Sequence, residues 1–273
     1  MSASFESLSD AAILSELGPE VQRGLSRFEI YDEIDSTNQA LLDDDAPVQG
    51  KLTVCLAEYQ TAGRGRRGRT WIAPSGGCLC FSVGWLYDRV PRDVTALALA
   101  AGVVIRRALQ EAAGVTAQLK WPNDLVVDDK KLGGVLVELR TGSDGTCYVV
   151  IGVGINVSIE PEELKSISGW SNGAIDLFTT TGGRPPSRNV LAAKMLQELS
   201  LLFPCYSDSG FSAYHAEFLG FDYLRGRQVS IDDASPPVSG AAAGVDEIGA
   251  LLVDSGDRVE RIVAGDVSVR MIG

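Results

Sequence analysis

The hydrophobic pattern of this 273-residue chain changes near residue 222, and this change constrains its fold more than any other feature. Before that point, helical and strand patterns alternate, including a strand over 78–87 and a helix over 93–113 that Gly114 ends. After it, only short strand patterns follow, over 227–231, 238–245, 250–254, 259–264 and 266–270. We therefore predict an α+β domain with a mixed sheet over residues 1–222 and a small all-β, barrel-like domain over 223–273.

Local signals refine the first domain. Ser36 is expected to cap a short helix that ends at Leu42. The Asp128–Asp129 pair is expected to form the hairpin turn between two strands. A strand that begins near residue 146 is expected to end in a glycine-rich loop, GVGIN at 152–156. An amphipathic helix is predicted over 189–203.

Composition points to a globular protein. Hydrophobic residues make up 45% of the chain, and charged residues are interspersed among them. The N-terminus lacks the basic and apolar regions of a secretory signal, and the longest apolar run, 94–105, is too short to span a membrane. The five cysteines form no C-x-x-C pair, so we expect reduced thiols rather than disulfides or a zinc site. The sequence thus predicts a cytoplasmic protein.

Positive charge is concentrated in the centre of an acidic chain. The formal net charge is −12, and residues 1–50 hold eleven acidic residues against two arginines. Residues 51–140 instead hold thirteen basic residues against eight acidic ones. Four of these bases lie within six positions, in the stretch GRGRRGRTW at 63–71. A basic centre in an acidic chain predicts a focused anion site, whereas a nucleic-acid-binding protein more often has an extended basic face.

The arginine-rich stretch has several interpretations. GRGRRG matches the spacing of a dinucleotide-binding turn, but the residues that follow, including Pro74, do not start a helix. A P-loop is excluded because no G-K-[ST] closes the motif. A solvated basic loop and an arginine clamp for carboxylate or phosphate oxygens remain. Glycines 63, 65 and 68 favour the clamp, because they let the backbone aim the arginines inward.

A second polar cluster consists of KWPNDL at 120–125 and KKLGG at 130–134. The proline bends the chain after a strand, which would present Asn123 and Asp124 at the end of that strand. Asp124 is a candidate for binding Mg²⁺ or a ligand amine, and Lys131 is a candidate for binding a phosphate. Taken alone, the cluster is equally consistent with an ordinary turn.

Together, these motifs resemble the biotin–protein ligase family. GRGRRGRTW, KWPNDL, KKLGG and GVGIN occur in the family's order and spacing, with DSTN at 35–38 and EYQTAGRG at 58–65. The C-terminal strands resemble the family's small SH3-like domain. The resemblance implies an enzyme that joins biotin to ATP and releases pyrophosphate. It then passes the biotinyl group from biotinyl-5′-AMP to a lysine of a biotin carboxyl carrier protein, such as an acetyl-CoA carboxylase subunit.

The resemblance also implies which residues form the site. Those expected to bind biotin are Ser36, Thr37, Asn38, Gln60, Arg64, Gly65, Arg66, Lys131, Gly133, Gly152 and Gly154. Those expected to bind ATP or the adenylate are Arg66, Arg67, Arg69, Trp71, Lys120, Asn123 and Asn156. Asp124 is the candidate Mg²⁺ ligand. Arg66 and Lys131 are the expected catalytic pair, because cations on two reacting anions reduce their repulsion, and both side chains must then face one pocket.

Some family members carry an N-terminal winged-helix domain and repress transcription. Here only about 30 residues precede the first family motif, so we expect neither DNA binding nor repressor activity. The nearest rival is a lipoate–protein ligase, which has a similar fold and uses the same adenylate chemistry on another carboxylic acid. A nucleic-acid-binding protein is the rival from a different class. The oligomeric state, a homodimer included, stays open.

Overall fold

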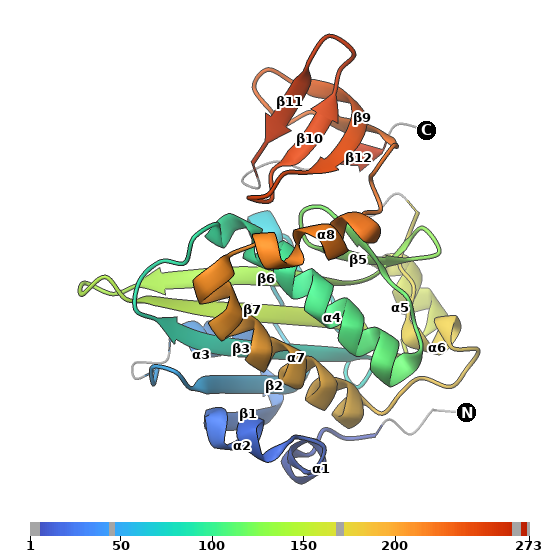
Figure 1. Cartoon of the computed structure of the whole chain (residues 1–273). Helices are drawn as coiled ribbons and strands as arrows, with labels where there is room; N and C mark the ends of the chain where they lie inside the picture. The colour runs from blue at the N-terminus through green and yellow to red at the C-terminus, as the bar shows by residue number, and fades with distance from the viewer. Residues whose placement is uncertain (1–5, 44–46, 168–171, 264–268, 272–273) are drawn as a thin grey trace.

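The computed structural model describes residues 6–43, 47–167, 172–263 and 269–271, which form a larger α+β part and a small all-β part (Figure 1). The helices are α1 (Asp10–Ser15), α2 (Pro19–Gly24), α3 (Thr37–Leu42), α4 (Leu97–Ala113), α5 (Pro161–Ser166), α6 (Leu177–Thr180), α7 (Arg188–Ser209) and α8 (Ser212–Gly220). The strands are β1 (Leu25–Ile34), β2 (Leu52–Gln60), β3 (Cys78–Tyr87), β4 (Gln118–Lys120), β5 (Asp124–Val127), β6 (Lys130–Thr141), β7 (Cys147–Asn156), β8 (Gln228–Ile231), β9 (Val238–Val245), β10 (Leu251–Asp254), β11 (Val259–Ile262) and β12 (Arg270–Met271). Within these residues, no helix combines the length and apolar character that crossing a membrane requires.

A seven-stranded mixed sheet forms the centre of the larger part. Its strand order is β1-β2-β3-β7-β6-β5-β4, and β1 and β2 are its parallel pair. The predicted hairpin between β5 and β6 is confirmed, since Asp128 and Asp129 both have positive φ, 50° and 58°. Two consecutive positive φ values are what a tight type I′ turn requires. The strand predicted over 78–87 is β3, with the same ends.

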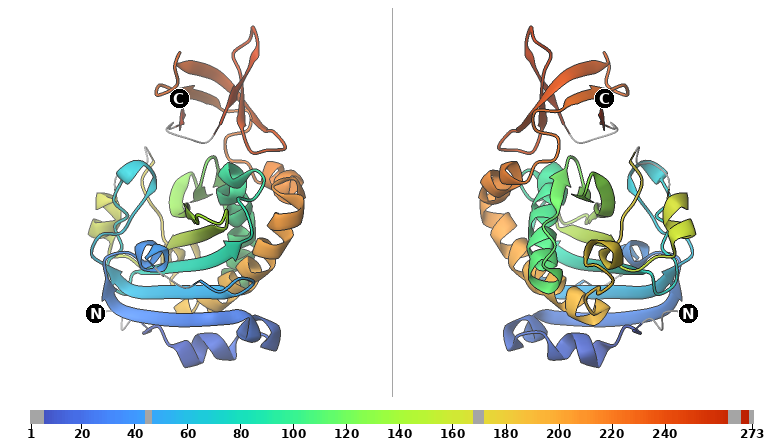
Figure 2. Two further views of the ribbon diagram at one scale, coloured as in Figure 1. Left: turned by 90° about the vertical axis from the view of Figure 1, so that its left-hand side faces the viewer. Right: turned by 90° about the vertical axis from the view of Figure 1, so that its right-hand side faces the viewer.

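Helices α4 and α7 cover one face of this sheet and supply much of its core (Figures 1 and 2). The helix predicted to open at Asp93 instead begins with a 3₁₀ turn over 94–96, and it ends before Gly114 as predicted. The predicted helix over 189–203 continues as α7 through Pro204 to Ser209. Its last turns bury large side chains such as Tyr206, so tertiary packing stabilises the helix beyond the proline.

The opposite face of the sheet carries α3, whose N-cap is Ser36 as predicted; the Ser36 hydroxyl accepts from the Gln39 N–H. The prediction for GVGIN is wrong, because β7 runs through these residues to Asn156. A Cβ at Gly152 would lie 2.1 Å from Asn38 Oδ1, and one at Gly154 would lie 2.5 Å from the Trp71 ring. Gly152 and Gly154 are therefore required because a side chain at either position would clash with Asn38 or Trp71. Neither glycine has a positive φ.

The small part is an antiparallel sheet with the order β11-β10-β9-β8-β12. Its strands β8 to β11 lie within the strand patterns predicted over 227–264. Residues 264–268 are outside the described part of the chain, so the strand predicted over 266–270 is seen only at its end, as β12. The predicted domain boundary between 222 and 223 falls between α8 and β8 and stays a prediction.

The two parts are connected through the segment around β4. The Tyr223 N–H donates to Leu119 O at 2.9 Å, and the indole N–H of the fully buried Trp121 donates to Gly249 O at 3.0 Å. Arg227 of the small part lies 3.0 Å from Asp129 in the β5–β6 turn. These contacts hold the small part over the end of the larger part where α8 and β5 lie (Figures 1 and 2).

Candidate active site

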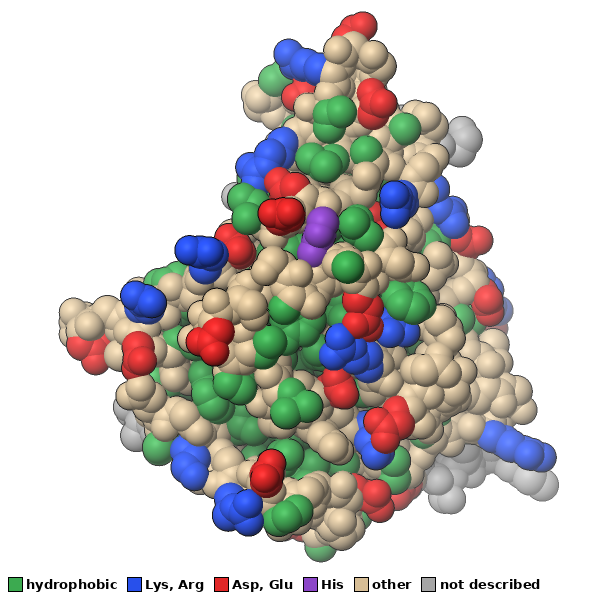
Figure 3. All heavy atoms as spheres, viewed as in Figure 1, with side chains coloured by type: hydrophobic (Ala, Val, Ile, Leu, Met, Phe, Trp, Pro, Cys, Tyr) green, Lys and Arg blue, Asp and Glu red, His purple; other side chains and the backbone are tan. Residues whose placement is uncertain are grey.

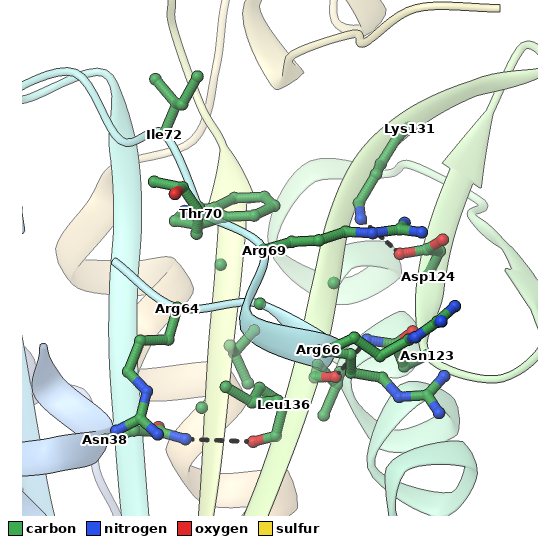
Figure 4. A pocket seen from close by; sticks show the side chains of 18 of the residues that line it. Asn38, Arg64, Arg66, Arg69, Thr70, Ile72, Asn123, Asp124, Lys131 and Leu136 are labelled. Atoms are coloured by element: carbon green, nitrogen blue, oxygen red, sulfur yellow. Dashed lines mark hydrogen bonds and ion pairs between the residues drawn. The ribbon is translucent and has the colours of Figure 1, made fainter. Parts of the chain in front are cut away.

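A cavity of about 910 Å³ gathers most of the predicted site residues (Figure 4). Its walls come from α3, the arginine-rich segment, the KWPND turn, strands β6 and β7, and Val269 and Arg270 of the small part. The predicted residues that line it are Ser36, Thr37, Asn38, Gln60, Arg64, Gly65, Arg66, Arg67, Arg69, Trp71, Lys120, Asn123, Asp124, Lys131, Gly152 and Gly154. Arg66 and Lys131, distant in the sequence, therefore face the same cavity.

Two predicted residues are not among those that line the cavity. A Cβ at Gly133 would point at Gly154 O and Ile155, whereas the next residue, Gly134, does line the cavity. Val126 pairs with Lys131 but Leu125 pairs with Gly133, so a β-bulge at Leu132 shifts the alternation by one residue and puts Gly134, rather than Gly133, on the cavity side with Lys131. Asn156 is 1% exposed, and its amide donates to the backbone oxygens of Lys131 and Ile175. Its position does not support an ATP contact; it holds the backbone from which Lys131 projects.

One end of the cavity is polar and tightly hydrogen-bonded. Gln60 Oε1 accepts from the Thr37 N–H at 2.8 Å and from the Thr37 hydroxyl at 3.1 Å. The Ser82 hydroxyl lies 2.6 Å from Asn38 Oδ1 and 2.7 Å from Thr37 Oγ1. Ser82 was not predicted as a site residue. Its place opposite Gly152 on the neighbouring strand follows from the pairing of β3 with β7, which only the structure shows. These buried amide and hydroxyl groups are held in fixed orientations and suit a neutral polar ligand group.

The other end of the cavity is cationic. Lys131 Nζ lies 2.5 Å from Asp124 Oδ1, and the Arg69 side chain extends toward this pair (Figure 4). Burial lowers the pKa of the Lys120 ammonium, and the charges of Lys131 and Arg69 add to this effect while Asp124 opposes it. Among the described lining residues, Asp124 is the one carboxylate. Several cations against one acid give this end the charge that phosphate and carboxylate groups require.

The arginine-rich segment is a narrow loop closed by backbone hydrogen bonds. The Trp71 N–H donates to Gly63 O at 2.9 Å, and the Gly65 N–H donates to Arg69 O at 2.7 Å. A Cβ at Gly63 would lie 2.5 Å from Trp71 O, so the close approach of the two sides requires glycine. The tip is a 3₁₀ turn at Arg66–Gly68, with no α-helix after it, and the dinucleotide-binding interpretation is therefore dismissed.

Trp71 forms a flat wall beside the cationic end. Its ring lies over Gly154, where a Cβ would come within 2.5 Å. Lys131 Nζ lies 5.7 Å from the ring centroid, within the range of a cation–π contact. A planar aromatic surface next to a cluster of cations can pack against a ring that is attached to a phosphate.

Comparisons with known proteins agree with this arrangement. Residues 31–156 match the model of the biotin/lipoate A/B protein ligase family, and residues 225–270 match that of the biotin protein ligase C-terminal domain. The bifunctional ligase/repressor BirA of Escherichia coli is 34% identical over 238 residues, which cover 87% of this chain and 72% of that relative. The biotin--[acetyl-CoA-carboxylase] ligase of Mycobacterium tuberculosis is 32% identical over 252 residues, 89% of each chain.

Solved structures give the same result. The biotin protein ligase from Aquifex aeolicus in complex with biotin and ATP is similar with a TM-score of 0.76 at 28% identity, covering 91% of this chain and 100% of that one. The mixed sheet with its cavity, followed by a small β domain, defines a ligase of the biotin/lipoate class. The chain belongs to the biotin protein ligase family.

Proposed function

We propose that this chain attaches biotin to a lysine of a carrier protein in two steps that use ATP. In the first, a biotin carboxylate oxygen attacks the α-phosphorus of ATP. The bond from this phosphorus to the bridging oxygen breaks, and pyrophosphate leaves. In the second, the carrier's lysine amine attacks the carbonyl carbon of biotinyl-5′-AMP. The bond to the phosphate oxygen breaks, AMP leaves, and the amine loses a proton to solvent.

The observation that carries this proposal is the shared cavity of Arg66 and Lys131. A carboxylate and a triphosphate repel each other, and the repulsion grows as they approach. Two cations that face the same space can each contact one anion, or share the forming acyl phosphate. Charges fixed in place before the reaction stabilise the transition state without reorganisation, which is where most of their catalytic benefit arises.

The two ends of the cavity divide the substrates. We assign the polar end, with Ser36, Thr37, Asn38 and Gln60, to the polar ring of biotin. We assign Arg64, Gly65, Gly152 and Gly154 to the acyl chain, because Gly152 adjoins Asn38 at the polar end and Gly154 lies under Trp71 beside the cationic end. We assign the cationic end of the cavity to ATP. The residues of this end are Arg66, Arg67, Arg69, Trp71, Lys120 and Asn123. The burial and hydrogen bonding of the first group and the charge of the second support this division.

We expect ATP to bind as its complex with Mg²⁺. Mg²⁺ in nucleotide enzymes is held by one or two carboxylates together with substrate phosphates, so the single carboxylate Asp124 among the described lining residues fits it. Asp124 would hold the ion, which would neutralise phosphate charge. The ion pair with Lys131 already fixes the position of this carboxylate.

The macromolecular partner we propose is a biotin carboxyl carrier protein, of an acetyl-CoA carboxylase or a similar biotin-dependent enzyme. We do not expect operator binding, since the arginines of 64–69 line a cavity suited to small ligands. On the face shown in Figure 3, basic and acidic side chains alternate and form no continuous basic band.

Mass measurement of a biotin carrier domain tests the proposal directly. The carrier is incubated with this protein, ATP, Mg²⁺ and biotin, and parallel reactions contain lipoate or omit ATP. We expect the carrier to gain one biotinyl group only with biotin and ATP. A carrier whose acceptor lysine is replaced by arginine should gain nothing. Modification with lipoate alone would identify a lipoate ligase, and salt-sensitive retention of DNA on a filter would favour the nucleic-acid interpretation.

A further inference from the structure

Glu138 connects two walls of the cavity, although no motif includes it. It lies on β6, two residues after Leu136, on the same strand face as that lining residue. Its Oε1 lies 2.7 Å from Arg64 Nη2, and its Oε2 accepts from Asn38 Nδ2 at 2.9 Å. One carboxylate therefore joins α3, the arginine loop and the sheet.

The contact with Glu138 favours one orientation of the Asn38 amide. A carboxylate accepts hydrogen bonds but does not donate them, so it selects the NH₂ end of Asn38. The oxygen end must then face Ser82, whose hydroxyl lies 2.6 Å away. The Asn38 NH₂ group also reaches Leu136 O at 3.4 Å. Glu138, together with the Leu136 carbonyl, thus selects the amide orientation that presents Asn38 Oδ1 to Ser82.

The same carboxylate holds the Arg64 side chain. The Arg64 guanidinium contacts Gln39 Oε1 as well, and its side chain is 41% exposed. In Figure 4 this side chain turns toward Asn38 and away from the Arg66 side of the loop. Because Arg64 is partly exposed, water competes for its guanidinium, and the contacts with Glu138 and Gln39 restrain its position.

We infer that Glu138 is a positioning residue for the carboxylic acid substrate: it orients Asn38 and holds Arg64 over the polar end of the cavity. The inference rests on the proposed function for the identity of that substrate. It concerns affinity for biotin rather than the chemical step, because Glu138 is not among the described residues that line the cavity and its contacts are with Asn38 and Arg64.

Glu138→Gln tests the inference, because it keeps the shape and removes the charge. We expect the KM for biotin to rise about three- to tenfold, with the KM for ATP and the kcat at saturating biotin within about twofold of wild type. Ligand-free Glu138→Gln should also be cut by trypsin within 64–69 several times faster than wild type. The matched control is Glu29→Gln, on β1 and away from the cavity, whose Oε2 lies 3.5 Å from Arg27. It should leave all four quantities unchanged.

A double-mutant cycle separates positioning from general loosening. If Glu138 acts through Arg64, adding Arg64→Ala to Glu138→Gln should raise the KM for biotin by less than Arg64→Ala does in the wild type. Additive effects would overturn the inference, and so would an unchanged KM for biotin, or equal rises of both KM values with a lowered Tm. If the wild-type protein fails to biotinylate a carrier, the proposed function fails, whereas trypsin cleavage still decides whether Glu138 holds Arg64.

Discussion

Lys131 and Asp124 form an ion pair at the cationic end of the cavity, with 2.5 Å between Nζ and Oδ1. They lie on the neighbouring strands β6 and β5, joined by the tight turn at Asp128–Asp129. The turn fixes the register of the two strands, and the register brings the ammonium and the carboxylate together. Lys131 is thus held in place before any substrate arrives, as electrostatic catalysis requires.

Replacement of Lys131 by alanine should slow adenylate formation by about 10²- to 10³-fold, because a preorganised cation is lost where negative charge develops. The rate of pyrophosphate release with biotin and ATP measures this step. Lys130→Ala is the matched control, since Lys130 is exposed at the adjacent position. Pyrophosphate release from Lys131→Ala at the wild-type rate would remove this residue from the mechanism.

Arg66→Ala should weaken retention of biotinyl-5′-AMP. Its guanidinium lines the cavity from the tip of the arginine loop, so its loss opens the site where the intermediate must be kept from water. We expect the intermediate to escape about tenfold faster and to modify free amines. Trapping of released adenylate by hydroxylamine measures the escape. Equal trapping in the variant and the wild type would contradict the expectation.

Gly152→Ala should impair biotin binding by displacing Asn38, since the added Cβ would lie 2.1 Å from Asn38 Oδ1. Crowding of this kind costs about 1–3 kcal/mol of unfolding free energy. We expect at least a tenfold loss of biotin affinity by calorimetry. Gly24→Ala serves as the control, because its Cβ would meet nothing within 4 Å. Normal affinity in Gly152→Ala would show that Asn38 does not contribute to the biotin site.

Asp222→Asn should stabilise the protein at neutral pH. Burial raises the pKa of Asp222 from 3.8 to about 6, while the Leu224 N–H and Arg225 oppose the shift. Its Oδ2 has no hydrogen-bond partner within the described residues. The folded state therefore favours the protonated acid, and the resulting stability is complete below pH 3.8 and is lost as the pH rises through about 6.

The asparagine variant avoids that loss because it stays neutral. Its unfolding free energy should exceed that of wild type by about 1–3 kcal/mol at pH 8, and the difference should shrink toward pH 4. Urea unfolding at several pH values measures it. A difference that stays constant from pH 4 to pH 8 would show that Asp222 does not titrate in this range.

Local chemistry along the chain was sufficient to predict several elements. The serine before α3 caps that helix, Gly114 ends α4, and the Asp128–Asp129 pair makes the β5–β6 turn, because each depends on a few neighbouring residues. The spaced motifs also predicted a family that the comparisons confirm. Most of the site residues that the family resemblance implied line one cavity.

What the sequence by itself determined is the family, the two kinds of secondary-structure pattern and most of the residues that face the cavity. Only the tertiary structure decided which strand face is open. It placed GVGIN inside β7, selected Gly134 over Gly133, and moved Asn156 behind Lys131. It also brought Glu138 between Asn38 and Arg64. The physical reason is that strand register and packing between distant segments determine these positions, and neither follows from nearest neighbours in the chain.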